Sequence, residues 1–172
     1  MEILIPGLIL VGFMIWASTR IKRNAAQAFE REEIENPHFS FTKPEGFLAP
    51  VDPAEGTEFS AYSKDFGRDD AERVRQAAAE VRRFDDANFE EICERVKSES
   101  EATVTEQIGV IAGRKCANIV VERSEDGVAV ETFYKIIAGE TAVYQLAITV
   151  LPEIKGDLSP RIDQFLASFV LK

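Results

Sequence analysis

The sequence predicts an α+β domain in which helices flank an antiparallel sheet of about six strands, preceded by a single N-terminal transmembrane helix. Three observations predict this fold class. Residues 3–17 carry no charge, residues 104–151 alternate in successive strand-like segments, and residues 88–96 and 159–169 repeat apolar side chains at helical spacing. The length of 172 residues favours one folded domain behind the apolar segment.

The composition excludes several classes of protein. A hydrophobic content of 45% is too high for a disordered chain, and two cysteines are too few for a disulfide scaffold. The chain has 20 Lys and Arg residues against 30 Asp and Glu, a formal charge of -10; residues 25–172 hold 17 cations and 29 anions, which is -12. Because this charge repels a polyanion, no nucleic-acid partner is expected.

The apolar run Ile3–Ala17 has three interpretations: a cleaved signal peptide, a buried core helix and a membrane anchor. No basic residue precedes it, and the positions before a cut near Ala17 hold large side chains, which disfavours a signal peptide. A core helix would be amphipathic, whereas this run is apolar on every face. We therefore predict a transmembrane anchor over residues 1–19, in contact with lipid through Ile3, Leu4, Leu8, Leu10, Phe13 and Trp16.

The basic residues after the run, Arg20, Lys22 and Arg23, predict the topology. Lys and Arg beside a span are retained in the cytoplasm, so the N-terminus is expected outside and residues 37–172 inside a bacterial-type inner (plasma) membrane. An extracytoplasmic domain is the alternative. Good helix formers over residues 20–36 predict a helical stalk that ends at Asn36 and Pro37.

The domain is expected over residues 37–172, and its first half contains both strand and helix periodicities. Alternation predicts strands over residues 38–42 and 58–66, with a loop over residues 46–56. Asp69 with Glu72 has the spacing of a capping box and predicts a helix that continues to Val81. Asn88 with Glu91 repeats the spacing before a second helix, whose apolar face would hold Phe89, Ile92, Cys93 and Val96.

The second half predicts a four-strand meander and a final helix. The strands are expected over residues 104–112, 115–123, 128–137 and 141–151, with a tight hairpin turn at Asp126-Gly127. Ser159 and Pro160 resemble a helix start. The apolar face of this helix would consist of Ile162, Phe165, Leu166 and Phe169.

Three segments carry a family resemblance: FSFTKPEGF at Phe39–Phe47, YQLAITV at Tyr144–Val150 and FLASFVL at Phe165–Leu171. With them, the order of elements over residues 38–171 resembles the PsbP-like superfamily, which also contains Mog1 and the bacterial DcrB and LpqN-type lipoproteins. The resemblance implies an antiparallel sheet flanked by helices. It also implies a non-catalytic role, since most members are accessory subunits of membrane complexes, partners of small GTPases or proteins of unknown role, and they share no catalytic motif.

The residues that could take part in catalysis or metal binding are better explained by structural roles. His38 is the only histidine, and no GxSxG, GxGxxG or Walker motif is present, so neither a catalytic residue nor a cofactor is predicted. Cys93 is expected to be a small buried hydrophobe. Cys116 follows Arg114 and Lys115, whose positive charges favour the thiolate and would lower its pKa, so a reactive or redox-sensing thiol is the alternative at this position. Acidic side chains are frequent over residues 69–94 without the spacing of a metal site.

Together these observations predict a non-catalytic, membrane-anchored accessory or scaffolding protein. Its partners would be membrane lipid, through the N-terminal helix, and a membrane-associated protein complex, on which the acidic domain docks. The alternative is a small-ligand or metal-binding module that uses a cleft between sheet and helices. An enzyme of unrecognised type is a third hypothesis.

Overall fold

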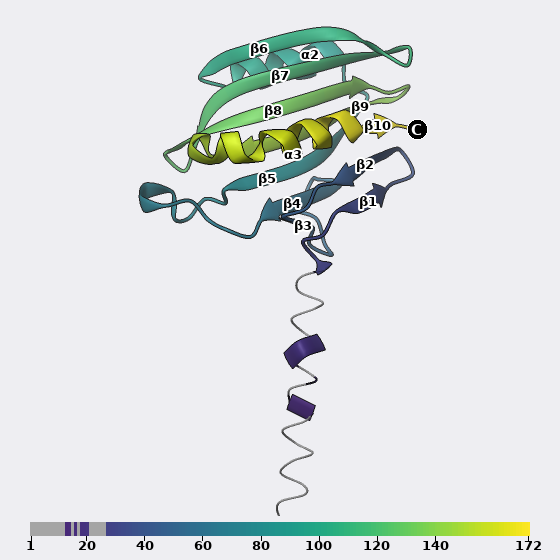
Figure 1. The fold of residues 1–172 in the computed structure, drawn as a ribbon. Coiled ribbons are helices and arrows are strands. Elements are labelled where there is room, and N and C mark those ends of the chain that lie inside the picture. Colours follow the sequence, from purple (N-terminus) through teal and green to yellow (C-terminus); the bar gives the residue numbers. More distant parts are fainter. Residues whose placement is uncertain (1–12, 15, 17, 21–26) are drawn as a thin grey trace, which may run out of the picture.

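The computed structural model describes residues 13, 14, 16, 18–20 and 27–172. They form an α+β fold with two antiparallel sheets (Figure 1). The small sheet has the order β1-β2-β10, with β1 at Glu32–Glu35, β2 at Phe39–Lys43 and β10 at Val170–Leu171.

The large sheet has seven strands in the order β3-β4-β5-β9-β8-β7-β6, and every neighbouring pair is antiparallel. The predicted C-terminal meander is confirmed and makes up more than half of this sheet. Asp126 and Gly127, with φ of +52° and +81°, form the tight turn between β7 and β8. The strands are β3 Phe47–Leu48, β4 Phe59–Ser63, β5 Ala77–Asp85, β6 Ala102–Ile111, β7 Arg114–Glu125, β8 Val128–Ala138 and β9 Ala142–Val150.

The helices α2, Phe89–Ser98, and α3, Lys155–Ser168, lie on opposite faces of the large sheet (Figure 1). The α2 helix begins as predicted, because the Asn88 side chain accepts a hydrogen bond from the Glu90 N–H at 2.9 Å. Its apolar face packs on β7 and β8, where Ala117, Ile119 and Val121 are buried.

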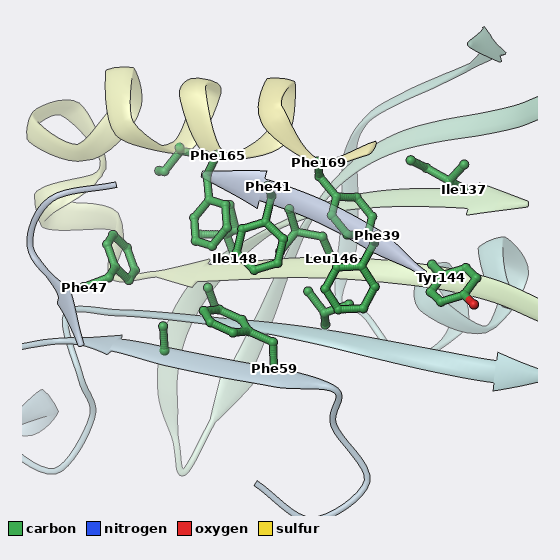
Figure 2. Packing of buried hydrophobic residues seen from close by; sticks show 14 of the residues in the cluster. Phe39, Phe41, Phe47, Phe59, Ile137, Tyr144, Leu146, Ile148, Phe165 and Phe169 are labelled. Carbon is green, nitrogen blue, oxygen red and sulfur yellow. The ribbon is translucent and has the colours of Figure 1, made fainter. Parts of the chain in front are cut away.

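The main core lies between α3, the small sheet and the large sheet, and is rich in phenylalanine (Figure 2). Phe165 of α3 is fully buried, with its ring centroid 5.2 Å from that of Phe41 and 6.0 Å from that of Phe47. The strand predicted at residues 38–42 supplies Phe39 and Phe41, which alternate inward. The aromatic segments that carried the family resemblance therefore meet in one core.

The segment 69–81 is not the helix that its capping box predicted. Asp69 has a φ of +52°, and Asp69–Ala71 forms only a short 3-10 helix, η1. The residues that follow form β5, which pairs with β4 on one edge and with β9 on the other. Pairing on both edges outweighs the helix propensity of its alanines.

The predicted helical stalk is wrong at its C-terminal end, because residues 32–35 form β1 and pair with β2. Asn36 and Pro37 lie in the connection between these strands, where the Asn36 N–H donates to the Phe39 carbonyl at 2.9 Å. The final helix also begins earlier than predicted. A 3-10 turn, η2 at Pro152–Ile154, leads directly into α3, so Pro160 lies inside the helix rather than at its start.

Lys43 fastens the segment before β1 to the domain. Its fully buried Nζ donates to the carbonyls of Ala28, Glu30 and Phe47 at 3.3, 2.7 and 2.8 Å. The Gly46 N–H adds a bond to the Phe29 carbonyl at 2.8 Å. Burial lowers the pKa of Lys43 and outweighs the opposing effect of Glu32. The chain therefore joins the domain at residues 28–30, well before the predicted end of the stalk.

Candidate functional site

A cavity of about 880 Å³ opens on the face of the large sheet that carries α2. It lies beside α2, which packs on β7 and β8, and extends over β9, β5 and β4 on the same face of the sheet. The floor consists of small and polar side chains from β5 and β9, among them Ala78, Gln145, Ala147 and Thr149. We call this cavity the sheet groove.

Two of the arginines around the sheet groove are neutralised by carboxylates of their own strands. Arg82 contacts Glu80 through two nitrogens, at 3.0 and 3.1 Å. Arg123 contacts Glu125 and also donates to the Tyr134 hydroxyl at 3.1 Å and the Thr149 hydroxyl at 3.2 Å. In a strand, residues i and i+2 point to the same face, which explains both pairs.

The other two arginines lie over aromatic rings. The Arg75 guanidinium stacks on Tyr62 and Phe66, 4.5 and 3.8 Å from their centroids, and donates to the backbone carbonyl of Lys64 at 2.7 Å. Arg95 lies over Phe84 at 4.4 Å. Within the described part of the chain, its guanidinium has no carboxylate partner.

Two residues that line the groove, Gln145 and Arg123, each bury a side-chain atom that has no hydrogen-bond partner among the residues described. In Arg123 this atom is Nε, and in Gln145, which is only 6% exposed, it is the acceptor Oε1. Buried polar atoms are nearly always paired, because an unpaired acceptor loses its bonds to water without replacing them. A polar group without a partner beside a cavity indicates a place where a ligand can bind.

The two residues considered for chemistry, His38 and Cys116, lie on different parts of the fold. His38 comes immediately before β2, where its Nε2 is 3.1 Å from a guanidinium nitrogen of Arg83. Over the residues that the structure describes, no cluster of three or more His, Cys, Asp or Glu side chains could hold a metal ion.

Both cysteines are buried, and the lowered pKa considered for Cys116 is wrong. Burial raises the pKa of the Cys116 thiol and outweighs the opposing influence of Lys135, the cation that affects it. Cys116 faces the α3 core, while Ala117 and Ile119 face α2. Burial, reinforced by Glu106, raises the pKa of the Cys93 thiol to about 11, consistent with the expected buried hydrophobe.

Several residues predicted to anchor the chain or set its topology, Ile3, Leu4, Leu8, Leu10, Lys22 and Arg23, lie outside the described residues. The others are helical and exposed, and the Arg20 guanidinium lies over the Trp16 ring, 5.3 Å from its centroid. Phe13 and Trp16 are more than half exposed. Among the described residues, no helix has both the length and the apolar character needed to span a membrane.

The free edge of the large sheet is a second candidate surface. β6 is the terminal strand, all ten of its residues are exposed, and no described strand pairs with its outer edge. After an irregularity near Val104, residues 105–111 pair regularly with β7. Ile108 and Val110 are 62% and 68% exposed, and the strand's one charged residue, Glu106, is paired with Lys97 at 3.0 Å. We call this surface the β6 edge.

Comparison with solved structures identifies the fold. A cyanobacterial PsbP, CyanoP from Synechocystis, aligns with 83% of this chain and 92% of its own length, with a TM-score of 0.57 and 10% identity. The fold is PsbP-like. LpqN of Mycobacterium tuberculosis, whose structure is described as that of a protein involved in cell envelope biogenesis, aligns with 83% of this chain and 91% of its own, with a TM-score of 0.56 and 9% identity.

A Bacteroides thetaiotaomicron protein has the same fold at 18% identity and a TM-score of 0.53, over 82% of this chain. This chain covers 48% of that protein's length. At these identities the likeness concerns the fold alone. No protein-family model and no curated protein matches the chain.

Sequence reasoning missed the sheet groove because its residues come from β4, β5, α2, β7, β8 and β9 and share no local motif. One signal was available. In YQLAITV, Gln145 interrupts a strand whose residues are almost all buried, on both faces of the sheet. A glutamine in such a strand requires a hydrogen-bond partner, and its position could have been identified as a candidate binding residue.

Proposed function

We propose that this chain is a membrane-anchored, non-catalytic accessory protein whose PsbP-like domain docks on an extended segment of a membrane-associated protein. The β6 edge carries the proposal. A terminal strand presents unpaired backbone N–H and C=O groups, and a partner segment can satisfy them by adding a strand. Natural edge strands are commonly protected by charges or prolines, which residues 107–111 lack.

The chemistry of the edge specifies the partner segment. Ile108 and Val110 lie on the side of the sheet that carries α2, as shown by their register partners Ala117 and Lys115 on β7. They offer apolar contacts to alternate side chains of an added strand. The net charge of -10 favours basic residues on the partner. The expected segment is thus extended, apolar at alternate positions and flanked by Lys or Arg.

The attachment of residues 28–30 by Lys43 supports docking close to the membrane. Residues 20–27 separate the end of the predicted anchor from this attachment. Even fully extended, eight residues reach no more than about 29 Å. The acidic domain is repelled by an anionic leaflet, which favours a protein over lipid headgroups as the docking surface.

The docking proposal is tested by purifying the full chain from detergent-solubilised membranes of its native cells. We expect a protein that co-purifies with the wild type and with Val51→Lys, a matched change at a 98% exposed loop residue, but is lost with Ile108→Lys. Equal recovery with both variants would contradict docking at the β6 edge.

We also propose that Arg20, Lys22 and Arg23 keep the domain in the cytoplasm. Fusion of the C-terminus to a reporter active only in the cytoplasm, or to one active only outside it, tests this topology. Activity of the cytoplasmic fusion alone is expected. Activity of the external fusion alone would establish the alternative, an extracytoplasmic domain.

A further inference from the structure

We propose that the sheet groove binds a small zwitterion, an amino acid or short peptide with a free ammonium and a free carboxylate group. This goes beyond docking at the β6 edge and depends on different residues. The volume of about 880 Å³ lies within the usual range for small-molecule sites, about 300–1,000 Å³. This volume is large enough for a molecule of one to four residues.

The unpaired Gln145 oxygen defines the first contact. An acceptor that is more than nine-tenths buried and has no partner in the described chain lowers stability, and a ligand N–H would satisfy it. Gln145 comes from the middle of β9, which is hydrogen-bonded to β5 and β8 along its length. The backbone that carries the amide is therefore fixed before the ligand arrives, which reduces the entropic cost of binding.

The charges that remain available define the other contacts. Glu80 and Glu125 are occupied by Arg82 and Arg123. The other two lining arginines, Arg75 and Arg95, have no carboxylate partner in the described chain. Because Arg75 already donates to backbone carbonyls and stacks on two rings, Arg95 is the guanidinium with more capacity for a ligand. Two lining carboxylates, Asp52 and Glu99, likewise make no ion pair with any described residue.

These unpaired groups match the two ends of a zwitterion. The carboxylates would attract the ligand ammonium, Arg95 would pair with the ligand carboxylate, and Gln145 would accept from a ligand N–H. A simple anion or a simple cation would satisfy only part of this arrangement. The lining holds four arginines and four acidic residues, so the groove has no formal net charge to favour either one.

The test is isothermal titration of the full chain in detergent with trialanine, which carries both charges and two internal N–H groups. We expect saturable binding that is at least tenfold weaker for N-acetyl-trialanine amide, which lacks both charges. Spermidine and citrate serve as a cationic and an anionic probe. Tighter binding of either than of trialanine, or no binding of any probe, would overturn the proposal.

Variants separate a binding role from a structural one. Gln145→Met keeps the length of the side chain and removes the unpaired acceptor, so we expect an unchanged or higher melting temperature together with at least tenfold weaker trialanine binding. Gln164→Met, a matched change at a half-buried residue on α3, should bind trialanine normally.

If Gln145→Met does not fold, Arg95→Gln, at an exposed position, provides the same comparison. Undiminished binding by a folded variant would overturn the assigned contact. Binding should be unaffected by Ile108→Lys, which separates this result from the docking proposal.

Discussion

Replacement of Phe165 by alanine tests the packing that joins the two sheets and α3. The ring is fully buried, and its centroid lies 5.2 Å from that of Phe41, 6.0 Å from that of Phe47 and 6.5 Å from that of Phe59. Its removal leaves a cavity bordered by three rigid aromatic rings that cannot easily collapse into it. We expect a loss of about 3–5 kcal/mol in the free energy of unfolding.

That loss is a large fraction of the roughly 5–15 kcal/mol that stabilises a typical domain. The assay is urea unfolding of the full chain in detergent, followed by circular dichroism, with an unchanged m-value as evidence that both proteins unfold between similar states. Phe66→Ala is the matched control, because Phe66 is 45% exposed and its main contact is the guanidinium of Arg75. It should cost about 1 kcal/mol or less. Equal losses for the two variants would refute the location of the core.

Four further predictions concern the thiols, the α2 cap and the meander. Cys93 and Cys116 should not react with a thiol-disulfide reagent until the chain unfolds, and rapid labelling of the native protein would contradict their burial. The raised pKa of Cys93 gives a contribution to stability that is present below pH 9 and is lost as the pH approaches 11. The difference in free energy of unfolding between wild type and Cys93→Ala should therefore be about 2–3 kcal/mol smaller at pH 11 than below pH 9. A difference that stays constant with pH would argue against the raised pKa. Asn88→Ala should cost about 1 kcal/mol in urea unfolding by removing the α2 N-cap, whereas no change would show that the cap is dispensable. Gly127→Ala should cost about 1–2 kcal/mol through its positive φ alone, since an added Cβ there meets no atom within 4 Å; a neutral effect on the melting curve would contradict the turn.

The elements that the sequence predicted correctly are those in which local and tertiary preferences agree. In β7 to β9, alternation, β-branched residues and the Asp126-Gly127 turn all favour the meander that the structure contains. In α2, the Asn88 cap and the helical spacing of apolar residues agree in the same way. The fold class and the order of the later elements could therefore be read from the sequence.

The elements that the sequence predicted wrongly depend on pairing between distant segments. The alanines of β5 suit a helix locally, and only the strands β4 and β9 on its two edges make it a strand. Residues 32–35 likewise become β1 because β2 is available to pair with them. The sheet groove has the same origin, since its lining comes from one helix and five strands that only the folded topology brings together.

Photo-crosslinking at the β6 edge in intact native cells tests the central claim most directly. A photoreactive amino acid replaces Gln107, an exposed residue in the middle of the edge, and the control replaces Glu55, an exposed loop residue. We predict an adduct between this chain and a different membrane-associated protein that forms from position 107, is absent from position 55 and disappears with Ile108→Lys. Adducts that contain only two copies of this chain, or equal adducts from both positions, would contradict the claim that the PsbP-like domain docks on another protein through β6.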